Sequence, residues 1–212
     1  MKKIMFNDKY GLTEAVLEKR KTMTRRIIPI ELYNQTDWKA VSDGDYEAVV
    51  DGEGYYHDIR QCGQYQIGEE VAVAQKYKDV LRIANKDESV WQFLVKKDLL
   101  QSGGAVNTEF CSCAGWSNKM FVRADLMPHR IRITNIRLER LQDISDEDCM
   151  EEGVEKWMDC YIVTGIMYRD GKSNVCFDTP HEAFAALIDK LSGNGTWERN
   201  PWVFVYEFEL VK

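Results

Sequence analysis

The chain has 212 residues, of which 44% are hydrophobic and 30% are charged, and its mean hydropathy is −0.44. A chain of this length can bury roughly 70% of its unfolded surface, so we expect one domain elaborated by insertions. The formal net charge of −7 argues against a general nucleic-acid binder, because a uniformly acidic surface repels phosphate.

Other classes are disfavoured by simple features. No run approaches the roughly 20 apolar residues of a membrane-spanning helix. Polar residues 7–9 interrupt the start of the chain, which disfavours a secretory signal and favours a cytoplasmic location. Four Pro and 14 Gly are too few for a collagen-like or Pro/Gly-rich disordered chain.

The cysteines are sparse for a disulfide scaffold, so we expect all six to be reduced. Cys111 and Cys113 lie in a Gly/Ser-rich stretch and could contribute to a metal site. No second pair with zinc-ligand spacing accompanies them, so two ordinary thiols are the simpler interpretation and no metal is predicted. The cysteines are Cys62, Cys111, Cys113, Cys149, Cys160 and Cys176.

Charge is segregated along the chain. Residues 1–30 contain eight Lys or Arg against three acidic residues, a balance of +5. Residues 141–160 contain eight acidic residues against one Lys, a balance of −7. Binding of an anionic ligand would therefore depend on a local basic patch in the first segment.

In the first half of the chain, the apolar spacing of residues 12, 15 and 16 predicts a helix over 8–19, capped by Asn7 or Asp8. Asp43-Gly44 and Asp51-Gly52 indicate hairpin turns. Residues 68–77 predict a turn that feeds a strand. Residues 79–117 look like an insertion with a helix around 90–100 and a loop over 101–115.

In the second half, strands are predicted over 119–124, over 131–138 with a bulge near Asn135, and over 202–210. Ser145 begins a short acidic helix, and Thr179 opens a longer one through a capping box. Residues 154–178 look like a second insertion. Helices and strands mixed without βαβ regularity predict an α+β fold with a mainly antiparallel sheet or barrel.

The most distinctive chemical feature is the run from Lys19 to Arg26, which has five positive side chains and two threonines. One interpretation is a solvated run that opposes the dipole at a helix C-terminus. The other is a set of hydroxyl and cationic donors that binds an anionic or carbonyl-rich ligand.

The spacing Lys19-x-Lys21-x-x-Thr24-x-Arg26 resembles the Gly-x-Lys-x-x-Thr/Glu-x-Arg signature of ASCH domains, in the PUA-like superfamily. Further segments resemble phage and prophage members of this family, in the same order, over about half the chain. They are residues 65–75, 127–133, 140–148 and 195–203. The resemblance implies a small β-barrel flanked by helices, with a cleft that binds RNA or modified nucleotides.

One ASCH subgroup hydrolyses N4-acetylcytidine, and the resemblance implies Lys21 and Thr24 as its catalytic residues here. Gln75 stands where that subgroup has a Glu, and an amide cannot take a proton from a hydroxyl. Amidohydrolase activity is therefore disfavoured, although a desolvated Lys21 could act as the base. Gln75 is either satisfied inside the core or presents a donor and an acceptor to a base edge.

The leading prediction is a binding module for RNA or a modified nucleoside without a cofactor, and an amidohydrolase is the alternative. A third interpretation is that the acidic helix at 145–152 mimics nucleic acid or contacts a host factor. Trp197 is expected to be partly exposed for base stacking, and Tyr77 is expected near the cleft. His57, His129 and His181 are given no catalytic role. The predicted ligand contacts are Lys19, Arg20, Lys21, Thr22, Thr24, Arg25, Arg26, Gln75, Tyr77 and Trp197.

Overall fold

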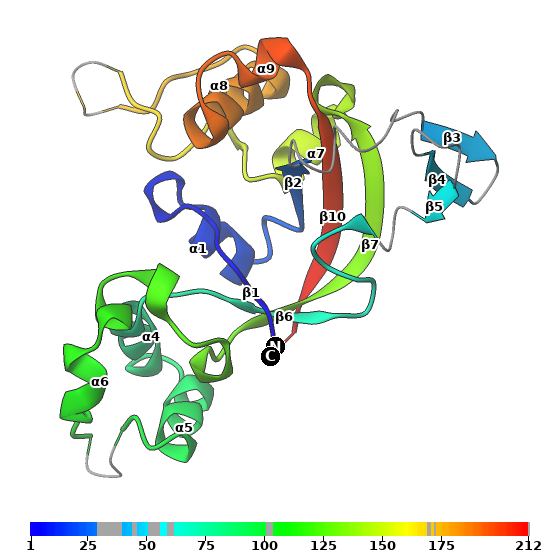
Figure 1. Ribbon diagram of the computed structural model, residues 1–212. Helices are drawn as coiled ribbons and strands as arrows, with labels where there is room; N and C mark the ends of the chain where they lie inside the picture. The colour runs from blue at the N-terminus through cyan, green and yellow to red at the C-terminus, as the bar shows by residue number, and fades with distance from the viewer. Residues whose placement is uncertain are drawn as a thin grey trace. The chain divides into compact units, whose positions relative to one another are not determined.

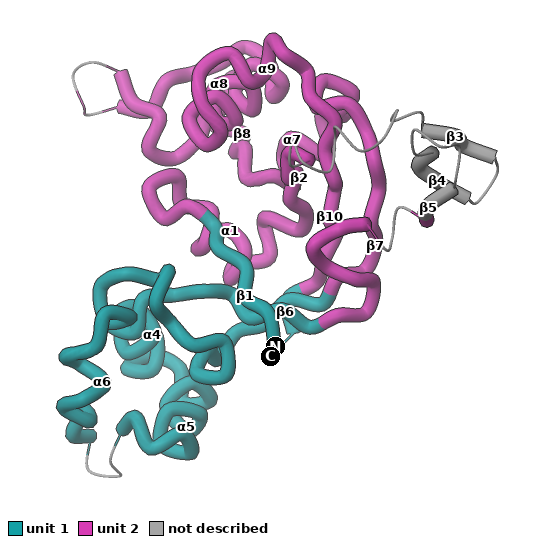
Figure 2. The backbone as a smooth tube through the Cα atoms, in the orientation of Figure 1, with its two compact units in different colours: residues 1–6, 70–132, 210–212 teal, residues 7–69, 133–209 magenta. Residues whose placement is uncertain are grey.

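The computed structural model describes residues 1–28, 40–43, 46–50, 56–58, 62–100, 104–168, 171 and 173–211, with backbone alone for 40–43, 46–50, 56 and 57. The chain divides into two compact units (Figure 2). Unit 1 contains residues 1–6, 70–132 and 210–212, and unit 2 contains residues 7–69 and 133–209. Whether the two units behave as a single domain stays a prediction.

The main sheet has five strands (Figure 1). β1 pairs in parallel with β6, whereas the β6–β7 and β10–β2 pairs are antiparallel. The strand order is β1 (Lys3–Ile4), β6 (Glu70–Val73), β7 (Arg130–Arg140), β10 (Trp202–Val211) and β2 (Met23–Ile27).

The fold is therefore α+β with a mixed, mostly antiparallel sheet, and the predicted class is confirmed. The predicted closed barrel is wrong for the part of the chain that is described. A barrel closes only when its first and last strands pair, and here β1 and β2 remain the two ends of the strand order.

A second, antiparallel sheet consists of β3 (Ala40–Asp43), β4 (Tyr46–Val50) and β5 (Tyr56–Asp58). Asp43 pairs with Tyr46 across the first hairpin, as the Asp43-Gly44 turn predicted. Gly44 itself and the second predicted turn, Asp51-Gly52, lie outside the described residues.

Unit 1 is built around a helical cluster in the first predicted insertion. It contains α4 (Tyr77–Ala84), α5 (Glu88–Lys96) and α6 (Thr108–Ser112), so the helix expected around 90–100 is confirmed and the loop expected over 101–115 contains a helix. Short 3-10 turns follow: η2 (Ala114–Trp116), η3 (Lys119–Phe121) and η4 (Ala124–Leu126). Their buried core includes Ala74, Tyr77, Val80, Val90, Leu94, Leu99, Phe110, Val122 and Met127.

The strand predicted over 119–124 is wrong, because η3 and η4 occupy this stretch. The side chain of Asn118 accepts a hydrogen bond from the backbone N of Met120 at 2.9 Å, which begins a turn. Asn and Asp side chains compete in this way with extended pairing.

Unit 2 begins with two short helical segments. Gly11, with φ of 65°, separates η1 (Asp8–Tyr10) from α1 (Leu12–Leu17), so the single predicted helix is broken at a left-handed residue. Asn7 caps the first segment through Lys9 N, as predicted.

The remaining helices of unit 2 are α7 (Asp146–Glu151), α8 (Pro180–Ser192) and α9 (Thr196–Arg199), with η5 (Leu141–Asp143) before α7. Ser145 Oγ accepts from Asp148 N at 3.1 Å and Thr179 Oγ1 accepts from Glu182 N at 3.2 Å, so both predicted caps are confirmed. Along β7 the buried positions shift from Ile131 and Ile133 to Ile136, which matches the predicted change of phase.

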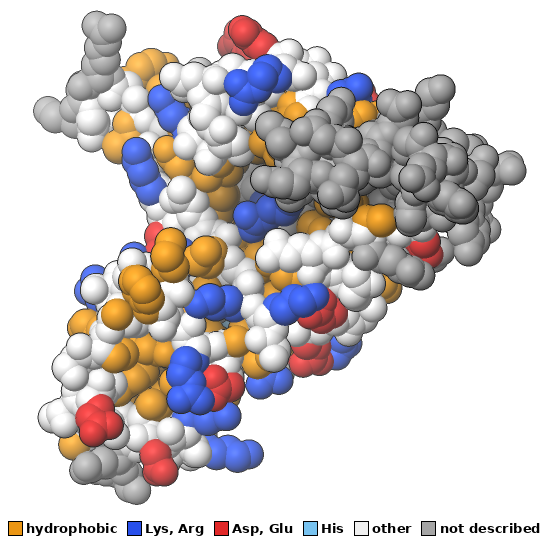
Figure 3. All heavy atoms as spheres, in the orientation of Figure 1, with side chains coloured by type: hydrophobic (Ala, Val, Ile, Leu, Met, Phe, Trp, Pro, Cys, Tyr) orange, Lys and Arg blue, Asp and Glu red, His pale blue; other side chains and the backbone are white. Residues whose placement is uncertain are grey.

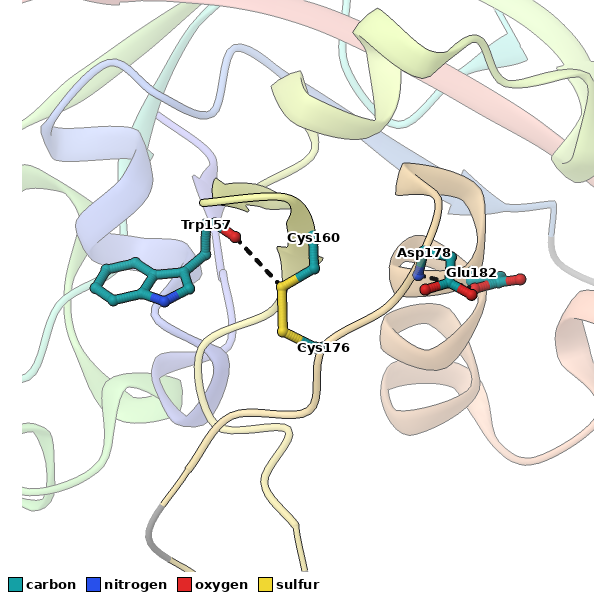
Figure 4. Close-up of a disulfide and its surroundings, with 5 residues drawn as sticks. All are labelled: Trp157, Cys160, Cys176, Asp178 and Glu182. Atoms are coloured by element: carbon teal, nitrogen blue, oxygen red, sulfur yellow. Dashed lines mark hydrogen bonds between the residues drawn. A yellow bond between two sulfur atoms is a disulfide. The ribbon is translucent and has the colours of Figure 1, made fainter.

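The second predicted insertion contains the hairpin of β8 (Glu155–Trp157) and β9 (Cys160–Ile162). A disulfide links Cys160 of β9 to Cys176, in the segment before α8 (Figure 4). Tyr161 and Phe177 exchange backbone hydrogen bonds, which brings the two cysteine Cα atoms to 5.6 Å. The expectation that all six cysteines are reduced was wrong at this pair. No helix in the described part of the chain is both long and apolar enough to cross a membrane.

Candidate functional site

The basic run is divided between a turn and a strand. Lys19 adopts a left-handed conformation with φ of 62° after α1, and both Lys19 and Arg20 are exposed. The Arg20 guanidinium contacts Glu18 at 2.8 Å and Glu155 at 3.2 Å. The run therefore begins at a helix end, as predicted, but from Met23 onward it forms β2.

Lys21 has its ammonium inside unit 2. Its Nζ donates to Oε2 of Glu152 at 2.5 Å and to the backbone O of Glu152 at 2.8 Å. Only 2% of Lys21 and 5% of Glu152 are exposed. The backbone N of Thr22 donates to Glu151 O at 3.1 Å, which holds this stretch beside the end of α7.

Arg25 extends the same cluster along β2. Its guanidinium contacts Glu139 at 2.5 Å, Asp148 at 2.6 Å and Glu152 at 3.3 Å. These carboxylates come from β7, from α7 and from the residue after α7. Lys21, Arg25, Glu139, Asp148 and Glu152 are called the buried charge cluster below.

The buried charge cluster perturbs its members in different directions. Burial lowers the pKa of Lys21 and outweighs the opposite effect of Glu152, while Arg26 and Arg25 lower it further. Burial acts to raise the pKa of Asp148, but hydrogen bonds and charge from Arg25 and Arg137 hold it below its usual value. The site thus contains a lysine with an increased neutral fraction beside carboxylates.

Cys149 lies on α7 within the same region and is fully buried. Burial raises the pKa of its thiol to about 12, so it stays protonated near neutral pH. A protonated thiol is a poor nucleophile, and Cys149 is therefore a packing residue.

The threonines of the run have separate positions. Thr22 Oγ1 donates to Glu151 Oε2 at 2.7 Å in an exposed pair. Thr24 is 5% exposed and pairs with Tyr206 across the β2–β10 ladder. Within the described residues its hydroxyl has no hydrogen-bond partner. Because side chains alternate along a strand, Thr24 lies on the face of β2 opposite to Arg25.

Trp197 lies on α9 and is half-buried, as expected for a partly exposed ring. Its ring meets Phe184 of α8 edge-on at 6.1 Å. At the nearby end of β7, Gln142 Nε2 donates to Trp197 O at 2.8 Å, and the Arg140 guanidinium lies 4.5 Å from the ring centre of Trp202. Arg140 and Trp202 are both half-buried.

Gln75 and Tyr77 belong to unit 1. Gln75 is 4% exposed, and its Oε1 lies 2.8 Å from His129 Nδ1, so the internally satisfied interpretation of this amide is favoured. Tyr77 was expected on a strand, but β6 ends at Val73 and Tyr77 begins α4. It is 3% exposed, and its hydroxyl accepts from Arg123 N at 2.9 Å. Whether a ligand contacts Tyr77 stays a prediction.

The structure brings together Lys21 and Arg25 from the predicted set and adds Glu139, Asp148 and Glu152, which sequence reasoning did not select. The segregation of charge along the sequence could have indicated these acidic partners. The basic segment at 1–30 and the acidic segment at 141–160 supply opposite members of the same cluster. The acids of α7 were interpreted as helix-capping residues, which explains Asp146 and Glu147 but not Glu152.

Comparisons with protein-family models, with curated proteins and with solved structures find no match for this chain.

Proposed function

We propose that this chain acts on a modified nucleoside and hydrolyses an acyl amide on the base. The observation that carries this proposal is the 2.5 Å contact between Lys21 Nζ and Glu152 Oε2. The sequence pattern would have a Glu at position 75, where this chain has Gln. The carboxylate beside Lys21 is instead that of Glu152. A perturbed lysine with a specific charged partner is typical of catalytic sites.

The chemistry begins with the lowered pKa of Lys21, which increases the fraction of neutral amine near pH 7. The amine takes a proton from water, whose oxygen forms a bond to the acyl carbon; Thr24 is not the nucleophile, because it lies on the other face of β2. The bond from that carbon to the exocyclic nitrogen breaks, and Lys21 returns the proton to this nitrogen. The acyl group leaves as the carboxylic acid, and the neutral amine of Lys21 is restored.

Glu152 has a positioning role in this scheme. Its carboxylate and its backbone carbonyl hold Lys21 Nζ at two points. The carboxylate also stabilises the ammonium that forms when Lys21 takes the proton. Lys21 and Arg25 are both paired with carboxylates, which argues against their use as cationic contacts to an anionic ligand.

The test is incubation of N4-acetylcytidine with excess purified protein, with release of cytidine followed by chromatography. The expected result is release by the parent and a loss of about 10²–10⁴-fold in rate in Lys21→Met and Glu152→Gln. Glu151→Gln is the matched control, because Glu151 is adjacent, exposed and bonded only to Thr22 within the described residues. No release by the parent, or parental rates in folded Lys21→Met, would overturn the proposal.

A second candidate function is binding of RNA or a modified nucleoside without chemistry. It is favoured by the partly exposed pair of Arg140 over Trp202, in segments that carry the ASCH resemblance. Aromatic faces and arginines are what single-stranded nucleic acids stack on. If the protein does not hydrolyse N4-acetylcytidine, the hydrolase proposal falls and the binding function remains as the proposal.

Titration of short RNAs at low and moderate salt separates the two candidates. Arg140→Ala is expected to weaken binding and to reduce the dependence of log K on log salt by about one unit. Arg82→Ala is the control, since this side chain on α4 is 77% exposed and pairs only with Asp79 within the described residues. Equal RNA affinity of the parent, Arg140→Ala and Arg82→Ala would exclude Arg140 as an RNA contact.

A further inference from the structure

Unit 1 contains a pocket that the predicted ligand contacts do not explain. Its volume is about 290 Å³, and it lies among α6, η2 and the segment that follows η3. For scale, a dry apolar cavity of roughly 150 Å³ accommodates benzene. A pocket twice that size has room for a ligand of two fused rings.

The pocket has an apolar floor and one aromatic side chain at its mouth. Tyr77 and Phe110 are buried, with ring centres 4.4 Å apart, whereas Phe121 is 60% exposed. Leu99 and Leu126 complete the apolar lining. Figure 3 shows hydrophobic side chains gathered on the part of unit 1 seen in that view. Such a lining favours a flat apolar ligand.

Among the residues that the structure describes, two charged side chains line the pocket, and only one of them is held in an ion pair. The guanidinium of Arg123 is engaged by Asp125 through contacts of 2.7 and 3.1 Å, so that pair is close to neutral. Glu109 also lines the pocket and is exposed. Within the described residues its carboxylate contacts no cation, whereas the nearby charge of Lys97 acts on Asp125.

We propose that this pocket binds a small aromatic amine, with its rings among Tyr77, Phe110 and Phe121 and its cation beside Glu109. Aromatic faces attract cations, and the carboxylate adds a specific charge partner. The net charge of −7 also favours approach of a cation over an anion. The site depends on unit 1 alone and is independent of the proposed hydrolysis.

The test uses three probes that share one ring system and differ in charge: tryptamine, indole and indole-3-acetate. Binding is followed by calorimetry and by backbone amide NMR of the whole chain at neutral pH. Tryptamine is expected to bind most tightly and indole-3-acetate most weakly, with shifts of the amide signals of Phe110 and Gly115.

Glu109→Gln is expected to weaken tryptamine about two- to fivefold, the range of a solvent-exposed ion pair, and to leave indole unchanged. Glu88→Gln is the matched control, because this exposed acid on α5 contacts Gln92 and does not line the pocket. Equal affinity for tryptamine in Glu109→Gln and the parent would overturn the charge assignment.

Two further variants test the pocket itself. Ala114→Trp places a large side chain in the pocket at an exposed position, and Phe121→Ala removes the ring at its mouth. Both are expected to reduce the affinity for indole and tryptamine alike, more than tenfold in Ala114→Trp. No saturable binding by the parent, or parental binding in both folded variants, would overturn the proposal.

Discussion

Replacement of Arg25 by methionine tests the energetic role of the buried charge cluster. The side chain of Arg25 is 1% exposed, and methionine keeps much of its apolar stem while removing the cation. Glu139, which is 17% exposed, loses its cation. Asp148 and Glu152, which are 19% and 6% exposed, each lose one of two cationic partners and keep Arg137 and Lys21 respectively. Removing one partner of a buried pair costs about 3–5 kcal/mol, and we expect a loss in the free energy of unfolding of this size.

The loss should depend on pH because it arises from uncompensated carboxylates. In the parent, the lowered pKa of Asp148 contributes stability above its unfolded value near 3.9, and this contribution disappears as pH falls through the lower folded value. In Arg25→Met, protonation of the less compensated carboxylates relieves their repulsion. The difference between parent and variant should therefore shrink as pH falls from 7 to about 3, below the unfolded pKa of Asp.

Urea unfolding followed by circular dichroism at both pH values measures this difference. Arg20→Met is the control, since its exposed pairs with Glu18 and Glu155 should contribute less than about 1 kcal/mol. A loss below about 1 kcal/mol for Arg25→Met, or the same loss at pH 7 and about pH 3, would refute the assignment of a buried ionic cluster.

Three further changes probe other parts of the fold. Reduction of the Cys160–Cys176 disulfide, which spans 16 residues, should lower the free energy of unfolding by about 3 kcal/mol, and Cys160→Ser/Cys176→Ser should not respond to reductant. Equal urea midpoints with and without reductant would contradict this. Gly115→Ala should cost about 1–3 kcal/mol in urea unfolding, because the added Cβ would lie 2.4 Å from Tyr77 Cε2, and an unchanged midpoint would show that the ring moves freely. Ser145→Ala should cost about 1 kcal/mol by loss of the cap on Asp148 N, whereas no change would mean that α7 does not need this cap.

The sequence predicted correctly the helices whose starts are set by a neighbouring capping side chain. The Ser145 and Thr179 caps fixed the starts of α7 and α8, because a side-chain oxygen three residues before a backbone N is enough to begin a helix. The α+β class followed from the order of these elements. The break of the first helix at Gly11 was missed because a glycine next to apolar periodicity is compatible with either outcome.

Other errors came from competing patterns in one segment. Tyr77 continued the alternation of β6, yet Tyr77, Val80 and Ala84 also have helical spacing, and this second pattern is the one observed. The buried charge cluster was not predicted because Lys21 and Glu152 are separated by 131 residues. Opposite charge balances in two segments indicate an attraction, but they do not say which side chains meet.

Titration of the Lys21 amine by nitrogen-detected NMR is the measurement closest to the proposed chemistry. Burial predicts a pKa well below the usual lysine value of about 10.4. Glu152→Gln should lower this pKa further, because it removes the carboxylate that favours the ammonium. An ordinary lysine pKa for Lys21, or the same pKa with and without Glu152, would contradict the proposed acid–base pair.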